Sequence, residues 1–127
     1  MEVVIYAHPD NKKKEVLLKK IFQDVTSKPV MVFDFERLFD LLRGKRSECV
    51  IIVSLISNEK EIEVLSSAVP FIFNARHIII LPDNRDDLTS KALSLQPSYI
   101  SYSGVGFGDV CAVLNKIIRA HGTQPSK

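Results

Sequence analysis

Cysteine is scarce in this chain. Only Cys49 and Cys111 occur among its 127 residues, each within an apolar segment, and they form no repeated spacing. A disulfide framework is therefore not indicated. We interpret both residues as small core side chains in a reducing compartment.

Long apolar runs and a strong net charge are also missing. No run reaches the roughly 18 apolar residues that a membrane span needs, and the start lacks the pattern of a signal peptide. The 17 basic and 15 acidic side chains leave a net charge of +2, which gives no reason to expect nucleic acid as a partner. The basic run Lys12-Lys13-Lys14 is best explained as a solvated helix face. We expect a cytoplasmic protein without a membrane partner.

The chain does contain enough apolar residues for one folded domain. Hydrophobic residues make up 46% of it and charged residues 25%. A chain of this length can bury a core without disulfides or metals. Because there is no internal repeat and no linker before the end, we predict a single domain at residues 1–122 and a polar tail or linker at 123–127.

The most continuously apolar short segment is Cys49–Ile56, which we take as the central strand of a sheet. Apolar or small residues fill both of its alternating faces, as in a parallel strand that helices cover on each side. The predicted strands, in chain order, are Glu2–Ala7, Val30–Phe33, Cys49–Ile56, Ile78–Leu81 and Tyr99–Tyr102.

Apolar residues at helical spacing separate these strands. The predicted helices, in chain order, are Asn11–Val25, Phe35–Leu42, Glu59–Val69, Asp86–Leu95 and Val110–Ile118. We expect Asp10 or Asn11 to cap the first helix, and Asp86 or Asp87 to cap the fourth. The expected helix ends are Gly44 after the second helix, a break at Pro70 in the third, and Gly122 after the last, with no element assigned to Phe71-Ile72-Phe73.

Strands that alternate with helices predict right-handed crossovers and an α/β fold. We expect a three-layer, doubly wound, five-stranded parallel sheet of order 2-1-3-4-5, as in flavodoxin-like proteins. This order places the functional crevice at the carboxyl ends of the first and third strands.

The size and element order resemble the receiver domain of bacterial two-component response regulators over nearly the whole chain. The resemblance implies two acidic residues for magnesium after the first strand and a phosphate-accepting aspartate at the end of the third. It also implies a Ser or Thr ending the fourth strand and a Lys-Pro pair after the fifth. Tyr99 matches an aromatic residue often found on the fifth strand of that family.

The chemical residues of the family are not present at these positions. The matching positions hold His8 and Pro9, with Asp10 nearby, then Ser54, Pro82 and Tyr102. An acyl phosphate needs a carboxylate nucleophile, a cation held by oxygen ligands and a positive charge on the phosphoryl oxygens. We therefore interpret the chain as a degenerate receiver, or pseudo-receiver, that does not accept phosphate by the family mechanism.

Two other chemistries can be weighed at the expected crevice. A metal site could draw on His8, Asp10, Asp34 and Asp83. Acidic residues after strands are more often helix caps and turn formers, which is the interpretation that we prefer. Phosphotransfer onto His8, with Asp10 to orient the imidazole, is favoured less than a metal site.

The glycine-rich loop Gly104–Gly108 could cradle a phosphate with its backbone N–H groups. However, Asp109 places a negative charge where the anion would lie, so we prefer a flexible turn capped by Asp109.

Two hypotheses for function remain. The first is a non-enzymatic signalling or regulatory module that binds a protein partner, or a second copy of itself, through Tyr99 and Tyr102. The second is a small-ligand or nucleotide-binding domain that uses a crevice at the strand ends. Its candidate residues are His8, Asp10, Ser54, Ser57, Gly104, Gly106 and Gly108. No cofactor or resident metal is expected in either case.

Overall fold

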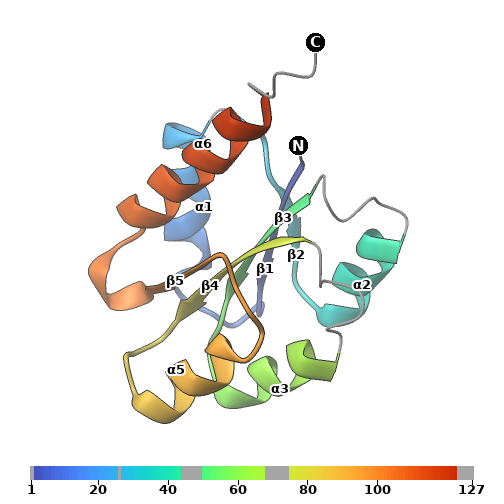
Figure 1. Ribbon diagram of the computed structural model, residues 1–127, viewed down its shortest axis with the longest axis vertical. Helices are drawn as coiled ribbons and strands as arrows, with labels where there is room; N and C mark the ends of the chain where they lie inside the picture. The colour runs from blue at the N-terminus through green and yellow to red at the C-terminus, as the bar shows by residue number, and fades with distance from the viewer. Residues whose placement is uncertain (1, 26, 44–49, 68–74, 123–127) are drawn as a thin grey trace.

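The computed structural model describes residues 2–25, 27–43, 50–67 and 75–122. It contains five strands, which are β1 (Glu2–Ala7), β2 (Val30–Val32), β3 (Val50–Leu55), β4 (Arg76–Leu81) and β5 (Tyr99–Tyr102). The helices in the described ranges are α1 (Lys14–Asp24), α2 (Phe35–Arg43), α3 (Glu59–Ser67), α5 (Asp86–Leu93) and α6 (Gly108–Gly122). A short 3-10 turn, η2 (Ser103–Val105), follows β5 (Figure 1).

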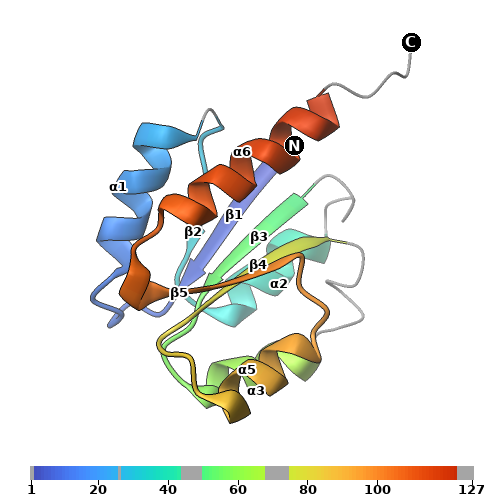
Figure 2. The same ribbon diagram turned by 60° about the vertical axis from the view of Figure 1, so that its left-hand side comes forward.

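All five strands run parallel in one sheet of order β2-β1-β3-β4-β5. The predicted α/β class and strand order are therefore confirmed. Helices α1 and α6 cover one face of the sheet, and α2, α3 and α5 cover the other (Figures 1 and 2). The result is the three-layer arrangement of flavodoxin-like folds.

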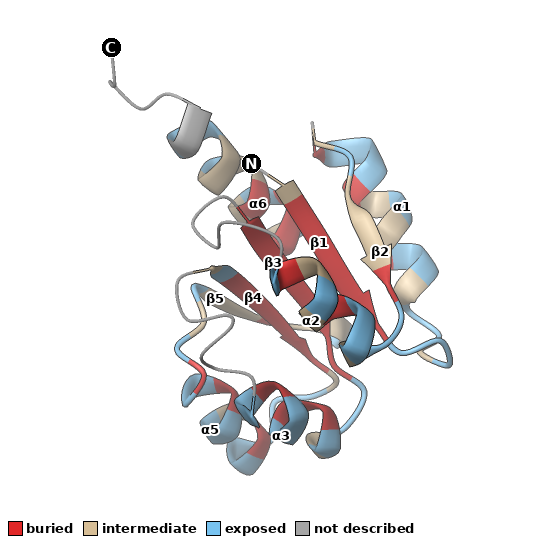
Figure 3. Ribbon diagram, turned by 90° about the vertical axis from the view of Figure 1, so that its right-hand side faces the viewer, coloured by how far each residue is buried: buried red, intermediate tan, exposed pale blue. Residues whose placement is uncertain are grey.

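The central strand β3 explains why the sheet needs helices on both sides. All six of its residues are buried, and Figure 3 shows the buried residues concentrated along the inner strands. Its odd-numbered residues pack toward α1 and α6, while Val50 and Ile52 pack toward α2, α3 and α5. This alternation follows from the two-residue period of a strand. Burial of each large side chain contributes about 1.5–3 kcal/mol.

Ser54 lies on the same face of β3 as Val50 and Ile52, the face that packs toward α2, α3 and α5. It pairs with Tyr6 in the β1–β3 register. Strand β4 begins at Arg76, two residues earlier than predicted, and so includes His77. His77 pairs with Ile52 in the register of β3 and β4. The early start of β4 brings a second polar side chain onto the same face of the sheet.

The predicted cap of the first helix is wrong. Helix α1 begins at Lys14, with Lys13 at the N-cap position and no side-chain cap. The N–H of Asn11 donates to the carbonyl of His8 at 2.9 Å, and the N–H of Lys13 donates to Asn11 Oδ1 at 2.9 Å. These turn contacts delay the start of the helix.

The predicted cap of the fourth helix is also wrong. Arg85 is at the N-cap position of α5 and makes no side-chain cap. Asp83 accepts the N–H of Arg85 at 3.1 Å and so forms the preceding turn. Asp86 and Asp87 lie in the first turn of the helix, where negative charge suits the helix dipole.

Several predictions concern residues outside the described ranges. They are Cys49 as the first residue of the central strand, Gly44 as a helix end, the break at Pro70, the unassigned Phe71-Ile72-Phe73, and the tail at 123–127. No helix in the described ranges is long and apolar enough to cross a membrane.

Candidate functional site

A pocket of about 480 Å³ opens at the carboxyl ends of β1 and β2, beside the first turns of α2 and α3. We call it the β1–α3 pocket. Its lining residues are Tyr6, His8, Pro9, Phe33, Asp34, Phe35, Asn58, Lys60, Glu61 and Val64. Carboxyl ends of strands in a doubly wound sheet are where such folds bind ligands.

Aromatic rings form one wall of the β1–α3 pocket. The ring of Tyr6 stacks on that of Phe35, with centroids 4.1 Å apart and planes 18° apart. Phe35 stacks in turn on Phe39, four residues later on α2, with centroids 5.9 Å apart. Spacing of four residues places both phenylalanines on one face of the helix. The stacked phenylalanines of α2 therefore hold the ring of Tyr6 in place.

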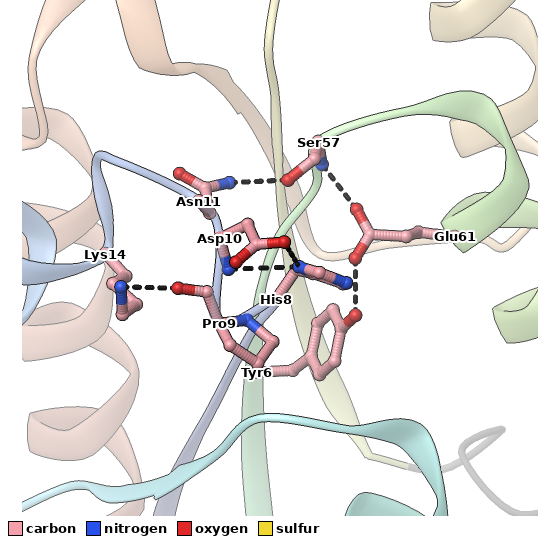
Figure 4. Close-up of polar contacts among 8 residues, drawn as sticks. All are labelled: Tyr6, His8, Pro9, Asp10, Asn11, Lys14, Ser57 and Glu61. Atoms are coloured by element: carbon pink, nitrogen blue, oxygen red, sulfur yellow. Dashed lines mark hydrogen bonds and ion pairs between the residues drawn. The ribbon is translucent and has the colours of Figure 1, made fainter.

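The hydroxyl of Tyr6 is held by a buried carboxylate from α3. It donates a short hydrogen bond to Glu61 Oε2, and the N–H of Ser57 donates to Glu61 Oε1 at 2.5 Å (Figure 4). Burial, followed by the hydrogen bond to Glu61, raises the pKa of Tyr6 well above its usual value. The phenol therefore remains protonated and acts as a donor.

The first turn of α3 positions this carboxylate. Asn58 Oδ1 accepts the N–H of Glu61 at 3.2 Å, as an N-cap residue does. The side chain of Glu61 turns back to the N–H of Ser57, the residue before the cap. The contact resembles a capping box, in which the acidic residue three positions after the cap bonds back to the start of the helix.

The loop after β1 forms the next side of the pocket. The N–H of Asp10 donates to His8 Nδ1 at 3.1 Å, and the Asp10 carboxylate lies 3.9 Å from the same nitrogen. His8 lines the β1–α3 pocket together with Tyr6 and Glu61. Asn11 Nδ2 donates to Ser57 Oγ at 2.8 Å, which ties the β1 loop to the β3 loop. Of the predicted crevice residues, the structure thus brings His8, Asp10 and Ser57 together.

Ser54 lies in the core and not at this edge. Its hydroxyl is 2.8 Å from His77 Nε2, and both side chains are buried. Burial lowers the pKa of His77 to about 4, so the imidazole is neutral at pH 7. Within the described ranges, His77 Nδ1 has no hydrogen-bond partner.

The glycine loop lies at the β5 end of the same edge and does not line the β1–α3 pocket. Gly104 and Gly108 are exposed, and Gly106 has a φ of +87°, a conformation that favours glycine. Asp109 is the second residue of α6, so it is not the N-cap that the sequence suggested. The Asp109 carboxylate accepts hydrogen bonds from Tyr99 at 2.8 Å and Ser101 at 2.6 Å.

The tyrosines of β5 are half-buried and have intramolecular partners. Tyr99 bonds to Asp109 of α6, which raises the pKa of Tyr99. The Tyr102 hydroxyl lies 3.4 Å from Thr89 Oγ1 of α5. The two side chains therefore join β5 to the helices on either side. Of the two prolines at the degenerate positions, Pro9 lines the β1–α3 pocket and Pro82 is half-buried after β4.

The acidic residues that were weighed as metal ligands have local roles. Asp34 Oδ1 accepts the N–H of Arg37 at 2.7 Å at the start of α2, and Asp83 forms the turn before α5. In the described ranges, no group of three or more His, Cys, Asp or Glu side chains is placed to hold a metal ion.

The residues that shape the pocket most were not predicted as site residues. They are Tyr6, Phe33, Phe35, Lys60, Glu61 and Val64. The spacing of Asn58 and Glu61 is the one signal that could have indicated a special role for Glu61, because it approximates a capping box.

No family model matches this chain, and no curated protein or solved structure shows significant similarity to it. The fold therefore defines the class, a flavodoxin-like α/β protein, and a fold of this kind does not by itself specify a function.

Proposed function

We propose that the chain is a non-enzymatic regulatory module that resembles a receiver domain and binds a small ligand in the β1–α3 pocket. Ligand occupancy takes the place of a phosphoryl group as the input, and binding of a protein partner is the output. This proposal joins the two hypotheses that the sequence left open.

The observation that carries the proposal is the position and make-up of the β1–α3 pocket. A volume of about 480 Å³ lies within the roughly 300–1,000 Å³ range of small-molecule sites. Apolar and aromatic walls surround a few polar groups, as is typical of such sites. The perturbed pKa of Tyr6 is a further feature that ligand sites often share.

The surroundings of Ser54 support the loss of phosphotransfer. Ser54 stands where the resemblance implies a phosphate-accepting aspartate, yet it is fully buried and bonded to His77. Its neutral hydroxyl cannot form the acyl phosphate on which receiver switching depends. The one buried carboxylate in the described ranges, that of Glu61, accepts hydrogen bonds from Tyr6 and Ser57.

Two measurements test whether the module responds to a bound ligand and not to a phosphoryl group. We expect a fragment screen by ¹H–¹⁵N correlation NMR to find ligands that shift the backbone amides of Phe35, Asn58 and Glu61. Treatment with acetyl phosphate should leave the intact mass unchanged. A stable gain of one phosphoryl group would contradict the proposal, as would a screen in which no fragment shifts these amides.

The output surface that we propose is formed by α5, β5 and α6. Tyr99 and Tyr102 link these three elements, and Leu93 of α5 is 58% exposed. Light scattering across a concentration series tests whether the partner is a second copy. A pull-down with the wild-type chain and with the Leu93→Ala variant tests whether the partner is a different protein. We expect the variant to retain less of that partner.

A further inference from the structure

Glu61 is the one acidic residue in the described ranges whose side chain is buried, with 6% of it exposed. Both of its hydrogen-bond donors, the Tyr6 hydroxyl and the Ser57 N–H, are neutral groups. Among the described residues, no lysine, arginine or histidine forms an ion pair with it. A buried carboxylate without a counter-charge is costly, so this wall of the pocket attracts positive charge.

A second carboxylate reinforces this potential. Asp34 also lines the pocket, and its carboxylate accepts a hydrogen bond from the neutral backbone N–H of Arg37. Lys60 is the one lysine or arginine among the lining residues, but it is exposed, so water screens its charge. Because Glu61 is buried and Lys60 is not, the carboxylate has the stronger effect inside the pocket.

The remaining walls are apolar. Phe33 is 43% exposed and Val64 is 39% exposed, which is unusual for large hydrophobic side chains in this chain. The two residues line the pocket together with Pro9 and the stacked rings of Tyr6 and Phe35. Aromatic faces next to carboxylates are the surroundings in which proteins bind organic cations. A hydrated metal ion, in contrast, needs a shell of oxygen ligands.

We propose that the β1–α3 pocket binds a small organic cation, namely an ammonium group attached to an apolar or aromatic body. The ammonium group faces Glu61 and Asp34, and the body covers Phe33 and Val64. This inference rests on the proposed function, because it specifies the chemistry of the ligand that the pocket takes.

Three probes of similar shape and different charge test the proposal. They are 2-phenylethylammonium, 2-phenylethanol and phenylacetate, each titrated into the full-length chain with NMR detection of the pocket amides. We expect the cation to bind at least about tenfold more tightly than the alcohol, a ratio that reflects one favourable charge contact. Phenylacetate should bind most weakly, since Glu61 and Asp34 repel it.

Matched variants separate the contribution of each wall. Asp34→Asn retains a side chain that caps helices well while removing the charge, and Asp87→Asn on α5 is its control. Phe33→Ala removes an exposed ring from the pocket, and Phe22→Ala removes a 55% exposed ring from α1, outside the pocket. We expect Asp34→Asn and Phe33→Ala each to weaken binding of 2-phenylethylammonium by about three- to tenfold, and the controls to leave it unchanged.

Glu61→Gln should weaken binding of 2-phenylethylammonium more than the other variants do, because it removes the buried charge. Thermal unfolding of the Glu61→Gln variant shows whether it remains folded. If Glu61→Gln does not fold, the Asp34→Asn variant still tests the proposal. Binding of the alcohol or of phenylacetate as tight as that of the cation would overturn the organic-cation proposal while leaving a ligand-binding pocket in place. Failure of all three probes and of the fragment screen to shift the pocket amides would overturn the proposed function as well.

Discussion

The hydroxyl of Tyr6 on β1 donates a hydrogen bond to the carboxylate of Glu61 on α3, 55 residues later in the chain. This contact joins the sheet to the first turn of the helix and forms part of the β1–α3 pocket. Because Glu61 is buried, loss of the donor leaves one carboxylate oxygen without its partner.

We therefore predict that Tyr6→Phe destabilises the fold by about 1–3 kcal/mol, the cost of an unsatisfied buried acceptor. Urea denaturation monitored by circular dichroism measures this change. Tyr102→Phe is a suitable comparison, because the longer 3.4 Å contact with Thr89 predicts a smaller loss. A Tyr6→Phe variant within about 0.5 kcal/mol of wild type would show that the hydrogen bond contributes little.

His77 makes stability depend on pH. Burial lowers the pKa of its folded form to about 4, whereas an unfolded histidine titrates at about 6.5. As pH falls from 6.5 toward 4, the unfolded chain takes up a proton that the folded chain does not, so this contribution to stability is present above pH 6.5 and is lost below it. The loss reaches about 3 kcal/mol in all.

Urea denaturation at pH 7 and pH 5 tests this dependence. We expect His77→Gln to reduce the difference in unfolding free energy between the two pH values. Equal pH dependence in wild type and His77→Gln would assign the effect to other groups.

Asp109 controls the titration of Tyr99. Its hydrogen bond is the main cause of the raised pKa of Tyr99, so Asp109→Asn should lower the pH at which this tyrosine ionises. Ultraviolet titration of the phenolate, with Tyr99→Phe to identify the signal, measures the change. The variant should also lose about 1–2 kcal/mol of stability, because Ser101 shares the same acceptor. An unchanged Tyr99 titration would contradict the role of the carboxylate.

Cys111 should be unreactive in the folded protein. Its thiol is buried, and burial raises its pKa, so little thiolate is present at neutral pH. In Cys49→Ser, the only remaining thiol is that of Cys111. We expect a colorimetric thiol reagent to modify this variant at least about tenfold more slowly in buffer than in denaturing urea. Equal rates would mean that Cys111 is accessible.

Local patterns in the sequence were sufficient to predict most of the fold. The apolar run that includes Val50–Leu55 and the helical spacing around Val110 and Leu114 indicate their elements because burial acts on each segment with its own period. The predicted caps of α1 and α5 were wrong, since Asn11 and Asp83 use their side-chain oxygens in the turns that precede these helices.

The candidate site was predicted less well. His8 and Ser57 were correctly placed at the carboxyl edge, because parallel strands bring their ends together. Ser54 was assigned to the crevice, but it lies in the core, where the early start of β4 supplies His77 as its partner. A short polar residue inside an apolar run gives no sign of which neighbour will satisfy it.

The sequence by itself determined the α/β class, the order of the strands and the two buried faces of the sheet, because these depend on hydrophobic period and on the handedness of crossovers. Only the tertiary structure decided that Glu61 would be buried against Tyr6 and that Phe33 and Val64 would line a pocket beside it. Such contacts join residues far apart in the chain. They depend on how helices pack on the sheet, which no local pattern specifies.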